Sequence, residues 1–402
     1  MKILFLSLKF PHSEVAGGYR IIYQRIRYLK EAGHQIGLVS FFDNEKESEI
    51  DSVHSLVDGL HLVPAPRRGI WKRIFHDYLM FLNRPAVFWK YYSHEMMKTV
   101  GDVVEQEQYD VVIAEFSEMG QYIYKNPYLS AIRKIISCHR CVTASYEKYQ
   151  SMDEIRLRLH YKTIPQMHIL RNYEFNMYRS VDHVVVLTPQ DRFTMQYYAQ
   201  DVAISIAPAG VDMEYICSGG ECKKEEWILM TGYMSDPANE DGAKWFIHHV
   251  WPELRKNHPH LKFYIVGAAP TKVIRRLAKK DERIIITGEV PDLRSYRCAA
   301  SVFVSPVRLG SGLRIKVLEA MAGNLPVVST SLGLEGLDAQ TGFNCLIADT
   351  PEMFVNSVEW LLTDGELRDR LAKNARQMVE EKYTLEIGMR RFEKIIKSVV
   401  EV

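Results

Sequence analysis

The chain has 402 residues, of which 47% are hydrophobic and 25% charged, and its formal net charge at pH 7 is +1. This length exceeds what one hydrophobic core normally organises, so two or three domains are expected. The near-zero net charge argues against nucleic-acid binding, which usually needs a clear basic excess. The longest apolar runs, at 3–8 and 183–189, are too short to span a membrane. We therefore expect a cytoplasmic globular protein without a nucleic-acid partner.

Short apolar runs alternate with amphipathic segments along the chain, which is typical of parallel α/β sheets. In the first half, strands are predicted by the runs KILFLSL, QIGLVSF, DVVIAEF, RKIISC and DHVVVLT. In the second half they are predicted by WILMTG, LKFYIVG, RIIITGEV and SVFVSP. The segment IIYQRIRYLKEAG predicts a helix that ends at Gly33. No cleavage site of small residues follows the first apolar run, so we interpret it as a buried strand rather than a signal peptide.

The two series of strands indicate two domains. A polar run, CSGGECKKEE, lies between them at 217–226, and we place the boundary near 210–225. The expected fold class is α/β, with two Rossmann-like, doubly wound parallel-sheet domains that face a cleft and bind ligands at the carboxyl ends of their strands. The expected parts are an N-terminal domain over 1–210, a C-terminal domain over 211–385 and an amphipathic C-terminal helix over 386–402.

The segment 64–98 departs from this alternation. It holds seven Arg or Lys residues against two acidic ones. Its interleaved aromatic residues are Trp71, Phe75, Tyr78, Phe81, Phe88, Trp89, Tyr91 and Tyr92. Basic and aromatic side chains on a helical segment suit an anionic membrane surface or a lipid-linked acceptor. The alternatives are a helical excursion whose aromatic side chains pack on the first domain, and a single-stranded nucleic-acid site.

Two further patterns bear on metal chemistry. The spacing of Cys138 and Cys141 resembles a redox or zinc motif, and Cys217 and Cys222 could complete a four-ligand site. A single Cys-x-x-Cys pair is weak evidence without a thioredoxin-like context. No Asp-x-Asp pair occurs in the chain, so the sequence predicts no metal-bridged diphosphate and no metal site.

The stretch GSGLRIKVLEAMAGNLPVVST at 310–330 predicts a glycine-rich turn, a helix and a strand. Arg314 and Lys316 would lie in the first turn of this helix, where cations are mildly unfavourable. They become favourable if an anion binds the first-turn N–H groups; the alternative is that both side chains point into solvent. Lys316 and Glu319 are three residues apart and share a helix face. Cations followed by a carboxylate suit the diphosphate and ribose of a nucleotide.

This block resembles the donor-binding signature of GT-B glycosyltransferases, most closely the retaining family 4 (glycosyl transferases group 1), and the resemblance covers nearly the whole chain. FPHSEVAGGYRIIYQRIRYLKEAGHQIGLVS resembles the opening of that family, and YRSVDHVVVLTPQDR and ISIAPAGVDMEYI resemble its last N-domain strands and hinge. ILMTGYMSDPANEDGAKWF, FYIVGAAP and IIITGEVPD resemble its first C-domain strands. The resemblance also implies that the C-terminal helix packs back on an acceptor-side N-domain.

The resemblance implies an enzyme of class EC 2.4. It would move a sugar from a UDP- or GDP-linked nucleotide-diphosphate sugar to a glycan, glycolipid or small hydroxylated acceptor, with retention and without a metal or other cofactor. Polysaccharide or glycolipid assembly would place it in the cytoplasm, with peripheral contact at the inner membrane face through 64–98. A nucleotide-sugar epimerase of the same fold and a non-catalytic GT-B partner subunit are the alternatives.

The resemblance also implies roles for individual residues. Glu319 matches the second Glu of the family's Glu–seven residues–Glu pattern, which holds the donor ribose, and His139 matches a histidine near the transferred sugar. The catalytic positions that it implies are His139, Arg314 and Lys316. The donor-binding positions that it implies are Gly17, Gly18, Gly232, Val290, Arg308, Gly310, Ser311, Gly312, Leu313 and Glu319.

The sequence departs from the family pattern at two places. Ser311 stands where the first Glu of the pattern is expected, so the usual contact with donor-sugar hydroxyls is missing or replaced. The chain reads GYMSDPANED after the first C-domain strand, where many members carry a basic pair. We therefore expect Arg314 and Lys316, with help from Arg308, to meet the charge of the diphosphate.

Overall fold

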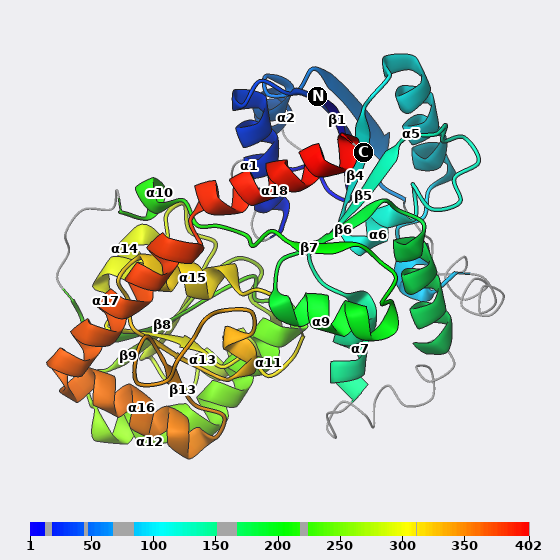
Figure 1. The fold of residues 1–402 in the computed structure, drawn as a ribbon. Coiled ribbons are helices and arrows are strands. Elements are labelled where there is room, and N and C mark those ends of the chain that lie inside the picture. The colour runs from blue at the N-terminus through cyan, green and yellow to red at the C-terminus, as the bar shows by residue number, and fades with distance from the viewer. Residues whose placement is uncertain are drawn as a thin grey trace. The chain divides into compact units, whose positions relative to one another are not determined.

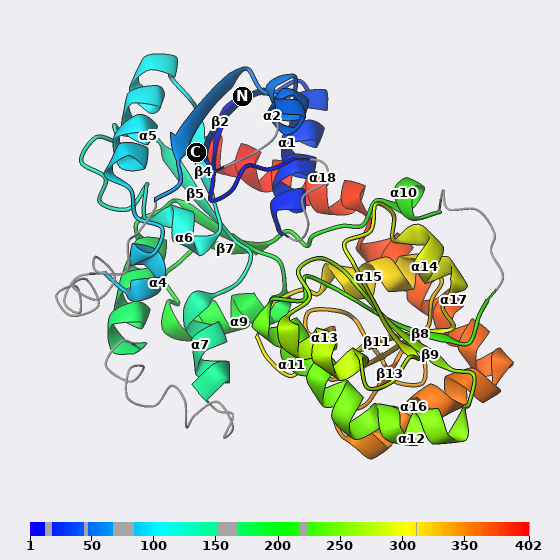
Figure 2. The ribbon, with the colours of Figure 1, turned by 180° about the vertical axis from the view of Figure 1, so that it is seen from behind.

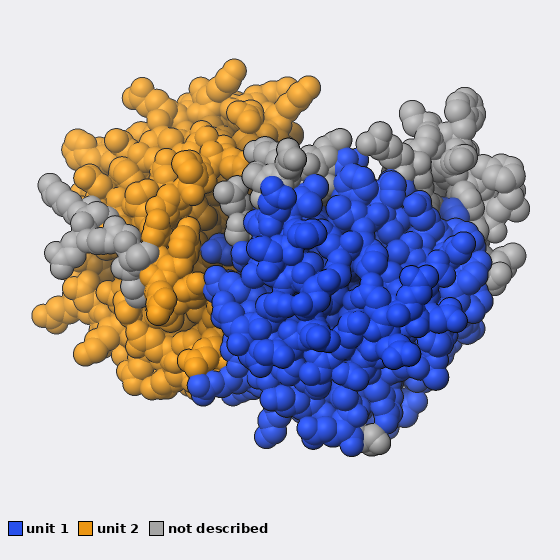
Figure 3. Space-filling view, turned by 90° about the horizontal axis from the view of Figure 1, so that it is seen from above, with its two compact units in different colours: residues 1–208, 389–402 blue, residues 209–388 orange. Residues whose placement is uncertain are grey.

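The computed structural model describes residues 1–12, 18–43, 47–66, 84–150, 167–217, 224–310 and 312–401. The chain forms two compact units, which Figure 3 distinguishes by colour. Unit 1 comprises residues 1–208 and 389–402, and unit 2 comprises residues 209–388. Each unit is an α/β structure around its own parallel sheet, as the sequence predicted.

Unit 1 is built on a seven-stranded parallel sheet in the order β3-β2-β1-β4-β5-β6-β7 (Figure 1). Its strands are β1 (Lys2–Ser7), β2 (Gln35–Phe42), β3 (Gly59–Pro64), β4 (Val111–Glu115), β5 (Arg133–Cys138), β6 (His183–Val186) and β7 (Ile204–Ile206). The strand order reverses between β1 and β4, so the loops after these strands diverge and leave room for a ligand at the carboxyl edge of the sheet.

Helices cover both faces of this sheet (Figures 1 and 2). They are α1 (Gly18–Glu31), α2 (Glu47–His54), α4 (Ala86–Trp89), α5 (His94–Glu107), α6 (Ser117–Gly120), α7 (Val142–Gln150), a helix over 167–179, and α9 (Pro189–Tyr198). The helix α1 ends as predicted, because Gly33 follows it with a φ of 84°. That left-handed conformation is cheap only for glycine.

The C-terminal helix α18 (Leu385–Val400) joins unit 1 through its residues from Met389 onward. Figures 1 and 2 both show α18 beside α1. Its buried side chains Phe392, Ile396 and Val399 pack in one apolar cluster with residues of α1 and β1. The amphipathic pattern of the sequence thus corresponds to one helix with a buried apolar stripe.

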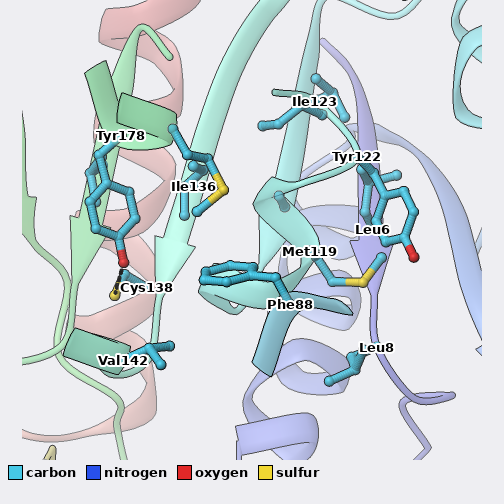
Figure 4. Close-up of a cluster of buried hydrophobic side chains, with 14 of the residues drawn as sticks. Leu6, Leu8, Phe88, Met119, Tyr122, Ile123, Ile136, Cys138, Val142 and Tyr178 are labelled. Carbon is cyan, nitrogen blue, oxygen red and sulfur yellow. Dashed lines mark hydrogen bonds between the residues drawn. The ribbon is translucent and has the colours of Figure 1, made fainter. Parts of the chain in front are cut away.

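The segment 64–98 is described only in part, because residues 67–83, which include Trp71, Phe75, Tyr78 and Phe81, lie outside the described ranges. Phe88 is buried and lies in the core of unit 1 with Met119 and Tyr122 (Figure 4). Trp89 and Tyr92 stack with 5.4 Å between ring centroids, and both are half-buried. Part of this aromatic set therefore packs against the protein, as expected for a helical excursion whose aromatic side chains pack on the first domain.

Unit 2 is built on a six-stranded parallel sheet in the order β10-β9-β8-β11-β12-β13. Its strands are β8 (Trp227–Thr231), β9 (Lys262–Val266), β10 (Ile284–Gly288), β11 (Val302–Ser305), β12 (Val327–Ser329) and β13 (Leu346–Ile347). The order reverses between β8 and β11, which makes the loops after these two strands the expected ligand-binding place in this unit.

The helices of unit 2 include one long helix with a π-helical middle, formed by α11, the turn Phe246–Val250 and α12. The elements are α10 (Met213–Cys217), α11 (Pro237–Trp245), α12 (Trp251–Asn257), α13 (Lys272–Ala278), α14 (Arg294–Ala299), α15 (Ile315–Ala322), the 3-10 turn Leu332–Leu334, α16 (Pro351–Thr363) and α17 (Gly365–Lys382). α15 is held by its buried residues, which pack on Phe303 and Val327 of the sheet.

Every strand predicted from an apolar run is present, but the sequence missed β3 and β13. β3 lies at the edge of its sheet and is mostly half-buried, so it lacks a continuous apolar run. His61 in its middle bonds Glu107 of α5 at 2.8 Å. β13 contains only two residues. Among the described residues, no helix is both long and apolar enough to cross a membrane.

The packing of α18 gives a stability prediction. Phe392 is 1% exposed, and its ring lies 3.9 Å from the guanidinium carbon of Arg25. Truncating a buried phenylalanine to alanine typically costs about 3–5 kcal/mol. We expect Phe392→Ala to lower the free energy of unfolding by that amount in urea titrations, whereas Arg391→Ala, at an exposed position next to it, should change little. Equal effects of the two substitutions would contradict the docking of α18.

Candidate functional site

A glycine-rich loop leads from β11 into α15 in unit 2. Gly310 and Gly312 have φ angles of 85° and 92°. Both angles lie in the left-handed region, where glycine avoids the strain that a Cβ atom would cause. Ser311, between them, lies outside the described residues. Leu313 follows half-buried and packs against the apolar cluster of α15. The loop thus turns sharply and directs the chain into the helix.

The N-terminus of α15 differs from several others in unit 2, although α14, with Leu293 at its N-cap, makes no side-chain capping hydrogen bond either. Among the described residues, no side chain caps it, since Arg314 occupies the N-cap position and makes no capping hydrogen bond. By contrast, Asp236, Thr271 and Thr350 each cap a helix of the same unit by accepting from a backbone N–H. The first N–H groups of a helix have no partner within the helix. At α15 these donors therefore suit an anionic ligand.

The two cations predicted for this helix lie at its start. The Arg314 guanidinium donates to the carbonyl of Leu309 at 3.1 Å. The Lys316 Nζ donates to Asn239 Oδ1 at 2.5 Å, and Asn239 Nδ2 in turn donates to the carbonyl of Tyr233 at 3.0 Å. Burial, and then the charge of Arg314, lower the pKa of Lys316 to about 7. Lys316 can therefore lose its proton near neutral pH, which removes the electrostatic cost of a cation at the start of this helix.

Glu319 lies one turn further along α15 and pairs with an arginine that the sequence analysis did not identify. Arg297 of α14 is 3% exposed and donates from Nη2 to Glu319 Oε2 at 2.5 Å. Buried arginines almost always have a charged partner. No spacing rule links α14 to α15, however, so only the tertiary structure reveals this pair.

Arg308 forms an ion pair with Asp241. Its Nε and Nη2 donate to the two oxygens of Asp241 at 3.1 and 3.0 Å, and its guanidinium lies 5.5 Å from the Trp245 ring. A bidentate ion pair of this kind compensates most of the charge on Arg308. Arg314 and Lys316 are therefore the better candidates for contact with a phosphate.

The other predicted donor-site residues of unit 2 lie at strand ends. Gly232 follows β8, and a Cβ atom there would lie 2.8 Å from Asn239 Nδ2, so glycine lets Asn239 reach Lys316. Val290 follows Gly288, which ends β10 with a φ of 75°, and is half-buried against the cluster around α15. The structure thus brings Gly232 and Lys316 together through Asn239.

A second polar cluster lies in unit 1, around His139 at the end of β5. His139 Nε2 lies 2.7 Å from Glu115 Oε2 at the end of β4. The Arg25 guanidinium of α1 donates to both oxygens of Glu115, at 2.9 and 3.0 Å, and to Ser137 Oγ at 2.5 Å. Arg25, Glu115 and His139 are all buried. The sequence predicted His139 but neither of its charged partners.

These contacts fix the protonation of His139. Burial alone would raise the pKa of Glu115, but the charge of Arg25 and the hydrogen bond from His139 outweigh it and lower that pKa to about 2. Burial lowers the pKa of His139, although Glu115 opposes the shift. Neutral His139 therefore donates from Nε2 to the carboxylate and keeps a lone pair on Nδ1. Nδ1 is buried and has no hydrogen-bond partner.

Gly18, the first residue of α1, lies against this histidine. A Cβ atom on Gly18 would lie 2.9 Å from His139 Nδ1 and 2.6 Å from the ring of Phe116, so no larger residue fits without displacement. The Phe116 ring stacks on His139 with 4.1 Å between centroids. Gly17 lies outside the described residues. The structure therefore brings Gly18 and His139 into contact.

The cysteine pair of unit 1 does not form a reactive site. Cys138 and Cys141 are free and buried, and burial raises the pKa of both thiols. Cys138 lies 3.4 Å from the Tyr178 hydroxyl inside the core (Figure 4). Both thiols stay protonated at neutral pH, which suits structural rather than redox cysteines. Among the described residues, no group of three or more His, Cys, Asp or Glu side chains could hold a metal ion.

The buried pair of unit 1 predicts a strong loss of stability on substitution. Glu115→Gln removes the negative charge and leaves Arg25 buried without a counter-charge, which typically costs about 3–5 kcal/mol. Urea unfolding should show this loss. Glu105→Gln, on the exposed surface of α5, is the matched control and should change the free energy of unfolding little. A loss for Glu115→Gln no larger than that of the control would contradict the ion pair.

The lowered pKa of Lys316 predicts a pH dependence of stability. Its pKa is about 7 in the folded protein and roughly 10.4 in an unfolded chain. Between these values the unfolded state binds more protons, so the free energy of unfolding should rise with pH. Lys316→Met should reduce this rise between pH 7 and 9, whereas Lys256→Met, on the exposed surface of α12, should retain it. If the free energy of unfolding depends on pH in the same way in the wild type and in Lys316→Met, the lowered pKa of Lys316 is refuted.

Comparison with known sequences finds a family match within unit 2. Residues 225–364 match the family described as Glycosyl transferases group 1. The chain is 23% identical to an "Uncharacterized 44.6 kDa protein in cps region" of Klebsiella pneumoniae, over 95% of this chain and 96% of that protein. It is 32% identical to an alpha-D-kanosaminyltransferase of Streptomyces kanamyceticus, over 38% of this chain and 41% of that enzyme.

Comparison with solved structures extends the likeness to the full length. The sucrose-phosphate synthase of Thermosynechococcus elongatus matches with a TM-score of 0.75 at 15% identity, over 99% of both chains. HepE of Anabaena, in complex with UDP and glucose, matches with a TM-score of 0.70 at 12% identity, over 99% of this chain and 100% of that one. These likenesses confirm the expected fold. The chain therefore has the GT-B fold, and its residues 225–364 match the family Glycosyl transferases group 1.

Proposed function

We propose that this chain is a glycosyltransferase that takes its sugar from a UDP- or GDP-linked nucleotide-diphosphate sugar bound at the N-terminus of α15. The observation that carries the proposal is the composition of this helix end. It has no side-chain cap among the described residues, Arg314 is its N-cap residue, and Lys316 and Glu319 follow in its first turns. HepE, a protein of the same fold, was solved with UDP and glucose, which supports a UDP-linked donor.

The diphosphate would lie against the first N–H groups of α15, beside Arg314 and Lys316. The positive end of the helix dipole and the two side chains would then act on the same anion. A bound diphosphate would raise the pKa of Lys316 from about 7 and hold the side chain in its charged form. The same groups would stabilise the negative charge that develops on the leaving diphosphate.

The ribose would be held by Glu319. Arg297 fixes one carboxylate oxygen through the contact of 2.5 Å, and an ionised carboxylate has about four acceptor positions in all. Glu319 can therefore accept hydrogen bonds from ribose hydroxyls while it stays paired with Arg297. Arg297 acts here as a positioning residue, because it holds the carboxylate without contacting the nucleotide itself.

The chemistry we propose is retaining and needs no metal, since Arg314 and Lys316 supply the positive charge that the departing diphosphate requires. The departing phosphate oxygen would take the proton of the acceptor hydroxyl, so no protein nucleophile is needed. His139 would contact a sugar. The acceptor would be a glycan or lipid-linked sugar, and the basic and aromatic segment 64–98 is the proposed place of contact with a lipid surface.

The proposal predicts which nucleotides stabilise the protein. In thermal-shift measurements with UDP, GDP, ADP and dTDP in EDTA, one uridine or guanosine diphosphate should raise the melting temperature. A ligand at about 100 times its dissociation constant stabilises by roughly 2.7 kcal/mol. Glu319→Ala should lose most of this shift, because it removes the acceptor for the ribose hydroxyls.

The matched control is Glu253→Ala, at an exposed position on α12, which should keep the full shift. If no nucleotide stabilises the wild type, with or without Mg²⁺, the donor site is wrongly assigned and a non-catalytic partner subunit becomes the better interpretation. If Glu319→Ala keeps the full shift, the nucleotide binds elsewhere.

A further inference from the structure

The helix α13 and the turn that follows it present only positive charge to solvent. The exposed cations of this basic face are Lys272, Arg275, Arg276, Lys279 and Lys280. Val273, which is 44% exposed, lies among them, and Ile274 is buried on the opposite side. Among the described residues, none of the five cations forms an ion pair, and Asp281 next to them pairs with Arg255 and Arg283 instead. Like charges three and four residues apart repel one another, so this arrangement does not stabilise α13 itself.

The helix α16 presents the opposite charge around an exposed aromatic side chain. Trp360 is 57% exposed, and Met353, two turns before it, is 44% exposed. Exposed Glu352 and half-buried Glu359 lie on the same side of the helix, and neither pairs with a Lys or Arg among the described residues. The surrounding range 341–366 contains five acidic residues and no Lys or Arg. We call Glu352, Met353, Glu359 and Trp360 the acidic face. An exposed tryptophan in such a setting is typical of a protein–protein contact.

The two faces lie at different ends of the sheet of unit 2. The helix α13 packs on α11 and on β10, which is one edge strand. The helix α16 packs on β12 and on β13, which is the other edge strand. Neighbouring strands lie about 4.8 Å apart, so the strand spacings from β10 to β12 separate the two faces by roughly 20 Å. The basic face therefore cannot meet the acidic face of its own unit.

A second copy of this chain offers each face its complement. Val273 and the cations around it would meet Met353, Trp360 and the carboxylates beside them, so apolar surface is buried while opposite charges approach. An anionic lipid surface would account for the basic face alone and would leave the acidic face without a partner. We propose that the basic face of one copy of this chain docks on the acidic face of another.

The geometry of this contact has two consequences. Because each copy carries both faces, the contact is head-to-tail and joins copies into rings or open chains rather than symmetric pairs. It weakens as the salt concentration rises, since exposed charges are screened by salt. None of the residues of either face belongs to the proposed donor site, so the inference does not depend on the proposed function.

Substitutions of exposed residues remove one face at a time. Arg276→Glu with Lys280→Glu reverses two charges of the basic face and leaves the acidic face intact. Trp360→Lys places a cation in the acidic face and leaves the basic face intact. The matched control is Lys373→Glu with Lys394→Glu, at exposed positions on α17 and α18, which changes the net charge as the first variant does. Melting temperatures within a few degrees of wild type show that each variant is folded.

Sedimentation velocity gives the mass of each protein from about 10 to about 200 µM, a range that detects micromolar association. In dilute salt the wild type and the control should exceed the 46.6 kDa of one chain, and increasingly so with concentration. Their association should weaken about tenfold when NaCl is raised from about 50 to about 500 mM. Each single-face variant should keep the mass of one chain. An equimolar mixture of the two should form a dimer and nothing larger, because only one complementary pair of faces remains.

The proposal is overturned if the wild type keeps the mass of one chain in dilute salt, or if either single-face variant associates within twofold of wild type. A mixture of the two variants that stays monomeric although the wild type associates also overturns it, since another surface is then responsible. Phosphatidylglycerol vesicles test a lipid partner. If a monomeric wild type binds them and the basic-face variant does not, the basic face belongs to a lipid surface and docking of a second copy is refuted.

Discussion

The ion pair between Arg25 of α1 and Glu115 of β4 organises the polar interior of unit 1. Removing two charges from water is expensive, and it is tolerable here because both carboxylate oxygens accept from the guanidinium and Oε2 also accepts from His139. The pair sets which nitrogen of His139 keeps its lone pair. The ring of Phe392 covers Arg25 from α18, so the C-terminal helix and the polar cluster stabilise one another.

In unit 2, as in unit 1, polar partners from other elements hold charged side chains in place. Lys316 and Glu319 are held in place by polar partners from other elements, Asn239 of α11 and Arg297 of α14. Each partner reduces the freedom of a charged side chain, which would lower the entropic cost of binding the proposed nucleotide. The lowered pKa of Lys316 shows the accompanying cost, because burial and the neighbouring charge of Arg314 destabilise its charged form.

The sequence predicted the features that depend on local pattern. Continuous apolar runs predicted the central strands, and the glycine-rich turn before α15 predicted a helix end suited to phosphate. β3 was missed because edge strands carry mixed polarity. Arg25, Glu115, Asn239 and Arg297 were also missed, since each meets its partner only after distant segments have packed together. The sequence likewise placed Arg314 inside the first turn of α15, whereas it is the N-cap residue. Nothing in a single chain reveals such long-range polar pairs.

The most direct test of this account is a crystal structure of the protein with UDP or GDP, whichever binds more tightly. We expect the diphosphate to lie within hydrogen-bond distance of the first N–H groups of α15 and of Lys316, and a ribose hydroxyl to bind Glu319 while Glu319 stays paired with Arg297. A nucleotide bound away from α15, or bound there with its ribose far from Glu319, would contradict the central claim.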